Sequence, residues 1–337
     1  MCLMVMSFRK ELVIMKRKRV GYNRYAKYGY IFSMPFMIAF LIFSFYPTVY
    51  TALIGFTDLK GIGNTEFHFL VEDPFLNFKL ILSNPSFITS FKNTVFLWIC
   101  NFIPQMVLAL LLAVWFTDKR MKIKGQGIFK ILLYMPNIIT AATIAILFNA
   151  LFGYPMGPVN DILVRLGIIE SPIPLLMNKN IARYIVIFIQ SWMWYGATMI
   201  ILISGILGIN PEIYESAEVD GANKIQKFYQ ITLPNIRTIL TFTLITSLIG
   251  GLNMFDIPKL FQNGGPDNST LTTSLFIYNQ AFSGSYMYNR AAAASMIMFI
   301  IIAILSAITF YFMRDKDEIL ERKKLKEMKR GRENGKR

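Results

Sequence analysis

Charged residues are scarce in this sequence, and their scarcity excludes an ordinary soluble protein. Only 16% of the 337 residues are Asp, Glu, Lys or Arg, whereas 54% are hydrophobic and the mean hydropathy is +0.46. Soluble domains typically carry about 25% charged residues. The composition therefore indicates a membrane protein, and the formal net charge of +15 is interpreted as a signal of topology, with no nucleic-acid partner expected.

Cysteine and histidine are also rare, which restricts metal binding and catalysis. Cys100 lies inside an apolar run and Cys2 lies at the terminus, so the two cysteines predict neither a disulfide framework nor a thiolate metal site. The single histidine, His68, excludes a paired-histidine zinc motif and is more often a solvated loop residue than part of a catalytic triad. We expect no metal site and no catalytic residues.

A phosphate-binding loop of the form G-x-x-x-x-G-K-[S/T] is missing from the sequence. Without such a loop, the chain lacks the motif that would let it bind and hydrolyse ATP by itself. We therefore expect the chain to bind no cofactor. Any ATP and magnesium that drive its activity are expected on a separate ATPase.

What the sequence does contain is six long apolar runs. A bilayer core of about 30 Å is crossed by roughly 20 helical residues, because backbone groups in lipid must form hydrogen bonds within their own segment. Pro35, Pro47, Pro104 and Pro136 lie inside these runs and predict bends, which suit either a gated pathway or packing alone. The sequence predicts an all-α membrane protein with six transmembrane helices at residues 30–56, 93–116, 128–152, 181–207, 236–255 and 291–313.

The distribution of Lys and Arg predicts the orientation of these helices. Of the 35 basic residues, 27 lie in four segments that alternate with the apolar runs, and 8 lie elsewhere. Because basic residues concentrate on the cytoplasmic side, both termini are expected in the cytoplasm of a multi-pass protein of the cell membrane. The first run is interpreted as a retained helix, whether translation starts at Met1 or at Met15. The four basic segments are residues 1–29, 117–130, 208–237 and 314–337.

This pattern divides the chain into a basic N-terminus over 1–29, a transmembrane domain over 30–313 and a basic tail over 314–337. A tail of this composition is expected to rest on anionic lipid or to contact a partner.

The loop at 208–237, between the fourth and fifth predicted spans, has the features of two short helices. Asn210 is a suitable N-cap, Pro211 fits the first helical position and Gly221 is a natural stop. A helix of about ten residues measures roughly 15 Å, half of what a span needs, so it is expected to lie along the membrane surface. A second short helix is expected over 223–231, before Pro234. Together the two short helices predict a protrusion to which a soluble partner can bind.

This loop resembles the EAA motif of the permease subunits of binding-protein-dependent ABC importers. The resemblance rests on Glu215-Ser216-Ala217, on Asp220-Gly221-Ala222, and on Ile231-Thr232-Leu233-Pro234, with nine residues between Gly221 and Ile231. Ser216 replaces the family's usual first alanine. The resemblance implies a type I importer permease fold in which this coupling loop docks on a cytoplasmic ATPase dimer through Glu215, Ala217, Asp220, Gly221, Ala222, Ile231, Leu233 and Pro234.

A second segment resembles the external region of the sugar-importing branch of that family. It comprises Phe255-Asp256, Asn263-Gly264-Gly265-Pro266, Thr272, Tyr278, Ala281 and Phe282. The resemblance implies a permease that moves a sugar or oligosaccharide delivered by an extracytoplasmic binding protein, beside a second permease subunit.

For the substrate pathway we select polar and aromatic residues near the middle of the fourth span or in the outer part of the fifth. Sugars are held by hydrogen bonds to their hydroxyls and by stacking on aromatic rings. Trp192 and Trp194 point about 200° apart on a helix, so only one of them is expected to face the pathway directly. The candidates are Gln190, Trp192, Trp194, Tyr195, Asn253 and Asp256.

Other functions remain to be weighed. An importer of another small polar solute, such as a glycerol phosphate, fits the same loop. An ion-coupled secondary transporter needs an ionisable residue deep in a span, and a membrane-embedded enzyme needs a cluster of His, Asp or Glu at one depth; neither is evident in the sequence. A membrane anchor does not account for the loop at 208–237.

Overall fold

A computed structural model describes residues 27–64, 66–118, 124–284 and 286–313. The expectations for the basic tail, for Cys2 and for the start of translation lie outside these residues. Within them the chain is helical, with one isolated antiparallel bridge between Thr57 and Phe69 and no strand. The all-α prediction is confirmed for this part of the chain.

Five of the described helices are long and apolar enough to cross a membrane, and a sixth span is formed if a bent pair is counted as one. Several are longer than the sequence predicted, because capping residues lie beyond the apolar runs; Asn84 caps the second helix and Asn178 caps the fourth. The five are Lys27–Ile54, α4 (Pro85–Thr117), α8 (Lys179–Leu207), Arg237–Gln262, which contains α12 (Arg237–Leu252) and α13 (Asp256–Gln262), and α15 (Tyr288–Met313).

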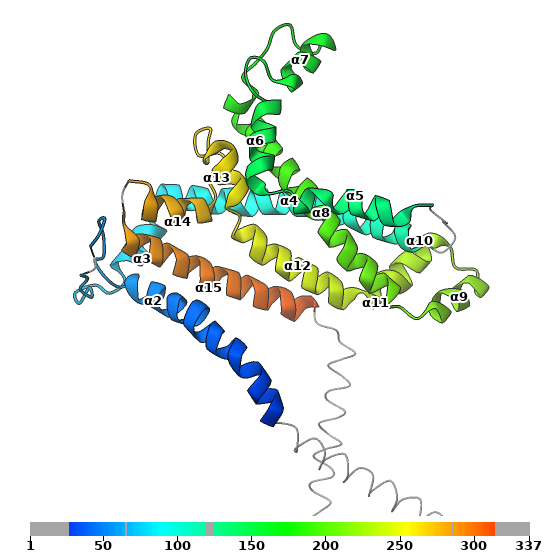
Figure 1. The fold of residues 1–337 in the computed structure, drawn as a ribbon, viewed down its shortest axis with the longest axis horizontal. Helices are drawn as coiled ribbons and strands as arrows, with labels where there is room; N and C mark the ends of the chain where they lie inside the picture. The colour runs from blue at the N-terminus through cyan, green and yellow to red at the C-terminus, as the bar shows by residue number, and fades with distance from the viewer. Residues whose placement is uncertain (1–26, 65, 119–123, 285, 314–337) are drawn as a thin grey trace, which may run out of the picture.

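The third predicted span is not one continuous helix. Helices α5 (Gln126–Ile138) and α6 (Ala141–Leu151) meet at a bend of 88°. The backbone is extended at Ile139, and the side chain of Thr140 then caps a new helix by accepting a hydrogen bond from the Thr143 amide. Figure 1 shows α6 rising almost perpendicular to α5. The break falls after Pro136, which stays inside α5.

Two prolines are preceded by a short stretch of wider π-helix. The first stretch, η1 (Leu41–Phe45), comes two residues before Pro47, and the second, η3 (Phe228–Thr232), comes two residues before Pro234. Proline has no amide hydrogen and its ring crowds the preceding turn, so a local widening of the helix relieves the mismatch. The helix then continues with a changed rotation.

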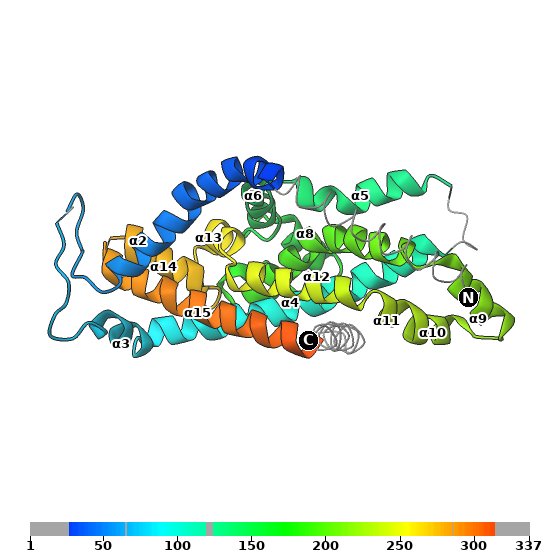
Figure 2. The same ribbon diagram turned by 90° about the horizontal axis from the view of Figure 1, so that it is seen from below.

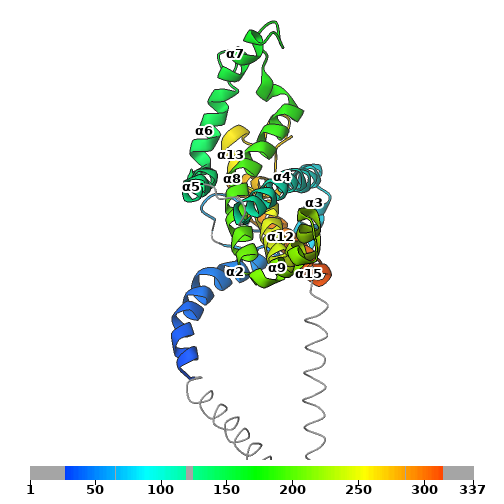
Figure 3. The ribbon, with the colours of Figure 1, turned by 90° about the vertical axis from the view of Figure 1, so that its right-hand side faces the viewer.

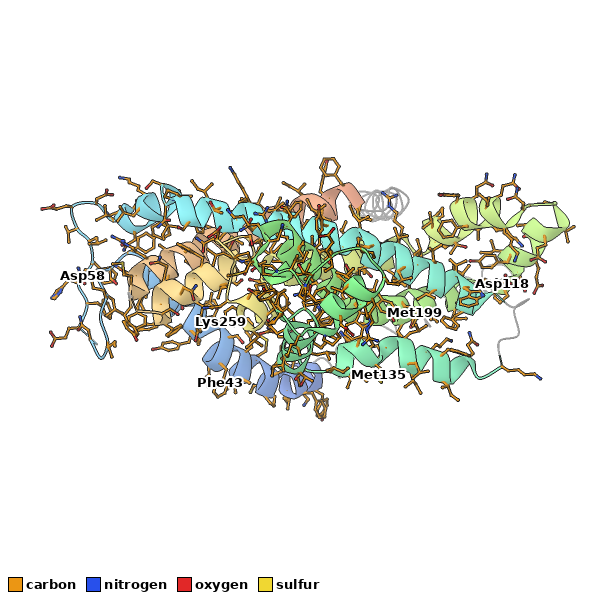
Figure 4. All side chains as sticks on the ribbon, turned by 90° about the horizontal axis from the view of Figure 1, so that it is seen from above. Phe43, Asp58, Asp118, Met135, Met199 and Lys259 are labelled. Atoms are coloured by element: carbon orange, nitrogen blue, oxygen red, sulfur yellow. The ribbon has the colours of Figure 1, made fainter. Side chains whose placement is uncertain are left out.

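The core of the body lies between α4 and α8. Leu97, Val186, Ile189, Met199 and Leu202 have no exposed surface and pack in two neighbouring clusters along these helices. A buried polar pair also joins them, because Gln105 Nε2 donates to Thr198 Oγ1 at 2.8 Å. Figure 4 shows Met199 in the centre of the body.

The first helix departs from the rest of the body. Every residue from 27 to 50 is exposed, and Figures 1, 2 and 3 show this helix swinging away from α15. Only its end is anchored, where the Asn77 side chain donates to the carbonyl groups of Gly55 and Thr57. Within the described residues, residues 27–50 of this apolar helix are therefore left uncovered.

Shorter helices occupy the connections. One end of the long axis, here called the α3 end, carries an exposed loop in which the His68 amide donates to the Asp58 carboxylate at 2.8 Å and lowers the pKa of that carboxyl. The opposite end, the α9 end, carries Asp118 (Figure 4). The remaining short helices are α3 (Leu76–Leu82), α7 (Pro158–Arg165), η2 (Leu175–Met177), α9 (Pro211–Val219), α10 (Lys224–Lys227), α11 (Leu233–Asn235) and α14 (Thr273–Phe282).

Candidate functional site

Helix α9 begins and ends as its sequence predicts. The Asn210 side chain accepts a hydrogen bond from the Glu212 amide at 3.1 Å. At the other end the Ala222 amide donates to the Ala217 carbonyl at 2.9 Å, and the Gly221 amide donates to the Glu218 carbonyl at 3.1 Å. This pair of bonds is a Schellman closure, in which the residue after the cap adopts a left-handed conformation. Gly221 supplies that conformation, with φ of +79°.

A second short helix follows the turn. Asn223 and Gln226 form a capping box, in which each side chain accepts a hydrogen bond from the other residue's amide at 2.8 Å. Helix α10, the widened turn η3 and α11 then lead into α12. The segment from α9 to α11, here called the elbow, projects at the α9 end of the molecule (Figure 1).

Polar contacts hold the two arms of the elbow together and join it to α4. Lys227 Nζ lies 2.7 Å from Glu218 Oε1, with the lysine side chain only 13% exposed. Lys224 Nζ lies 3.2 Å from Asp118 Oδ2, just beyond the end of α4, and the hydroxyl groups of Tyr214 and Thr232 are 2.9 Å apart. These contacts border a groove of about 350 Å³.

The residues expected to dock on an ATPase lie on this elbow. Glu215, Asp220, Gly221 and Pro234 are exposed. The remaining four, Ala217, Ala222, Ile231 and Leu233, are half-buried.

A cavity of about 430 Å³ lies among α4, α8 and α12, with the start of α13 at its wall. Its lining combines aromatic rings with amides and hydroxyls. The ring-bearing members are Trp98, Trp194, Phe242 and Phe255, and the polar members are Asn101, Gln105, Gln190, Asn253, Thr198, Thr243, Thr246, Ser247 and Asp256.

Four of the six residues selected for a substrate pathway line this cavity: Gln190, Trp194, Asn253 and Asp256. Trp192 does not, because its ring packs on Phe148 at a centroid distance of 6.0 Å, and Tyr195 is buried, with 7% of its surface exposed. Of the two tryptophans selected on α8, only Trp194 therefore lines the cavity.

Sequence reasoning overlooked the contribution of α4. Trp98, Asn101 and Gln105 lie at spacings of three and four residues, which places them on one face of a helix. Polar residues repeated at this interval in an apolar run are the same signal that identified Gln190. The same criterion, applied to the second predicted span, would have identified α4 as a wall of the cavity.

The ring of Trp98 is held against α12. Its indole Nε1 donates to Ser247 Oγ at 3.2 Å, and a Cβ atom placed on Gly251 would lie 2.0 Å from the indole Cδ1. Only glycine at position 251 lets the ring approach so closely.

The elbow connects the two walls of the cavity. Helix α8 carries Gln190 and Trp194 and ends at Leu207, four residues before Pro211; helix α12, which follows α11, carries Thr246 and Ser247. A displacement of the elbow therefore acts directly on two cavity-lining helices.

A multi-span helical body, a polar cavity within it and a protruding elbow that joins two cavity walls define a membrane transport subunit. The chain belongs to the family of binding-protein-dependent transport system inner membrane components, which matches residues 81–317.

Similar proteins cover most of the chain. The lactose transport system permease protein LacF of Rhizobium radiobacter is 30% identical over 86% of this chain and 94% of its own length. The arabinooligosaccharides transport system permease protein AraP of Bacillus subtilis (strain 168) is 31% identical over 83% of this chain and 86% of its own length.

Two solved structures share the fold. A chain of a bacterial ABC transporter involved in the import of the acidic polysaccharide alginate matches with a TM-score of 0.73 and 23% identity, over 87% of this chain and 98% of that chain. A chain of the bacterial alginate ABC transporter in complex with alginate pentasaccharide-bound periplasmic protein matches with a TM-score of 0.71 and 26% identity, over 85% of this chain and 93% of that chain.

Proposed function

We propose that this chain is the non-catalytic permease subunit of an ATP-driven importer that moves a sugar or oligosaccharide into the cell. The observation that carries the proposal is the elbow at 211–235, which joins two walls of a cavity lined by amides, hydroxyls and tryptophan rings. The names of LacF and AraP support a sugar as the solute.

In this proposal the elbow receives force from a separate ATPase dimer, which binds ATP and magnesium. Closure of the dimer pushes α9, and the Lys227–Glu218 pair keeps α9 and α10 moving together. Because α8 and α12 continue from the two arms of the elbow, their relative movement opens the cavity toward an extracytoplasmic binding protein. The elbow and both termini then lie on the cytoplasmic side, as the distribution of Lys and Arg predicts.

A second permease subunit is the expected neighbour of the first helix. Large apolar side chains on this helix, including Phe32, Phe36 and Phe43, are at least 70% exposed. Lipid covers part of such a surface, and a partner helix provides the packing contacts that this chain does not.

The role of the elbow is tested at Gly221. Valine disfavours positive φ strongly, so Gly221→Val is expected to distort the Schellman closure and to reduce both ATP-dependent uptake and co-purification of the ATPase at least tenfold. Gly221→Asn is the matched variant, because asparagine tolerates this conformation, and it is expected to keep both activities.

Gly63→Val controls for backbone strain elsewhere, since Gly63 has φ of +72° in the loop at the α3 end. It is expected to leave ATPase binding intact. Normal uptake and normal ATPase recovery with Gly221→Val would contradict the proposal that the elbow docks on the ATPase.

A further inference from the structure

We propose that the cavity accepts an uncharged saccharide and excludes solutes that carry a carboxylate or a phosphate. This inference rests on the proposed function and narrows its substrate class. It is carried by the charge of the lining, and the free hydrogen-bonding groups of the lining suit a saccharide.

The charge of the lining is negative. Among the described residues, Asp256 is the one ionisable residue that lines the cavity. The Asp256 side chain is exposed, and its carboxylate has no hydrogen bond or ion pair within the described residues. The cationic side chains Arg183 and Lys259, on helices that line the cavity, make their contacts outside it. Arg183 donates to Asn93 Oδ1 at 3.0 Å and to the Ser269 carbonyl at 2.9 Å, and Lys259 contacts Asn263 Oδ1 at 2.9 Å. An anionic solute would therefore meet a carboxylate without a compensating cation.

The hydrogen bonds of the lining leave both donors and acceptors free. The amide nitrogen atoms of Asn101, Gln105 and Asn253 each donate once, to the Leu97 carbonyl at 2.7 Å, to Thr198 Oγ1 at 2.8 Å and to the Ile249 carbonyl at 2.9 Å, respectively. Each of these amides has two N–H groups, so one donor and the side-chain oxygen remain available on each. The indole of Trp98 is likewise committed to Ser247, as described above.

Helix α12 adds acceptors and helix α8 adds donors. The hydroxyl groups of Thr243 and Thr246 donate to the carbonyl groups of Ile239 and Phe242, each at 2.8 Å, which leaves their lone pairs available. Gln190 keeps both of its N–H donors free within the described residues.

A surface that offers both donors and acceptors suits sugar hydroxyls, which donate as well as accept. Ionised carboxylate and phosphate groups only accept, and proteins usually hold them with Arg, Lys or backbone amides, whereas the described lining contains Asp256 and neither Arg nor Lys. This argument disfavours a glycerol phosphate. The fold itself does not decide the matter, because the structurally similar alginate importer carries an acidic polysaccharide.

The charge of the cavity can be measured before the solute is known. In a background of Cys2→Ser and Cys100→Ala, Thr246→Cys places a thiol on the lining. The intact complex with its ATPase and second permease is reacted in membranes with a cationic and an anionic methanethiosulfonate of similar size, and each rate is divided by the rate for a free thiol. We expect the cationic reagent to be favoured about tenfold.

Asp256→Asn is expected to bring this ratio close to one, whereas Glu212→Gln, on α9, is the matched control and is expected to leave it unchanged. Equal or faster reaction of the anionic reagent, a ratio insensitive to Asp256→Asn, or no reaction at position 246 would overturn the inference.

A second experiment identifies the sugar that the purified binding protein retains. A neutral sugar is expected. An acidic sugar that is nevertheless taken up with ATP would overturn this inference and leave the importer function standing. Loss of ATP-dependent uptake for every sugar would instead contradict the proposed function, and the labelling ratio would be unaffected.

Discussion

Gly251 determines how closely the ring of Trp98, one of the two tryptophans that line the cavity, approaches α12. The neighbouring Gly250 also lines the cavity, yet a Cβ atom at position 250 would meet nothing within 4 Å. The two adjacent glycines therefore differ in their contact with Trp98. They form a natural pair for testing whether the position of that ring matters.

We expect Gly251→Ala to displace the Trp98 ring and to reduce uptake about tenfold, since overpacking of this kind typically costs about 1–3 kcal/mol. Gly250→Ala makes the same change in helix propensity and is expected to retain most of the activity. Both variants are measured for uptake of the identified sugar and for recovery of the ATPase. Equal uptake by the two variants would show that the ring position has no influence.

At the scale of single residues, the selection of polar and aromatic residues in the fourth and fifth spans located four of the residues that line the cavity. Gln190 and Asn253 were selected because amides are costly in an apolar helix unless they have a use. The sequence left open which of Trp192 and Trp194 faces the cavity, because α8 is covered by neighbours on several faces and hydrophobicity does not fix its rotation. Only packing, here of Trp192 on Phe148, determines which tryptophan faces the cavity.

The elbow is the element on which mechanical coupling depends in the proposed function. Its Lys227–Glu218 pair is partly buried, whereas the Lys224–Asp118 pair has a lysine that is 65% exposed. Partly buried pairs contribute more than exposed ones, which are worth about 0–1 kcal/mol. The first pair is therefore the stronger candidate for keeping α9 and α10 rigid.

We expect Lys227→Glu to reduce the sugar transported per ATP hydrolysed about threefold or more, because two like charges would separate the arms of the elbow. The exchange Lys227→Glu with Glu218→Lys is expected to restore most of the coupling. Lys224→Glu serves as the comparison and is expected to have the smaller effect. Failure of the exchanged pair to recover, with normal complex assembly, would contradict a role for this ion pair.

At the scale of elements, capping residues were informative and bends were not. Asn210, Pro211 and Gly221 predicted α9, because each acts through local backbone chemistry. The break between α5 and α6 was missed, since Ile139 and Thr140 are common inside apolar helices. Their effect depends on tertiary contacts, such as the hydrogen bond from Asn149 Nδ2, on α6, to the Phe261 carbonyl at 2.7 Å.

The whole molecule has two distinct ends, and its proposed orientation can be tested at each. Ile62 lies in the loop at the α3 end and is 74% exposed, and Val219 ends α9 and is 88% exposed. In the cysteine-free background, we expect an impermeant maleimide to label Ile62→Cys in intact cells and Val219→Cys only in inverted vesicles. The reverse pattern would place the elbow outside the cell and contradict ATPase docking.

The uncovered first helix has a consequence for biogenesis. It is synthesised before the other described spans, yet among the described residues every position from 27 to 50 is exposed. We therefore expect this helix to pack stably only when another polypeptide is present. Synthesis of this subunit alone should yield a product that quality-control proteases remove, and joint synthesis with its companion should raise the yield.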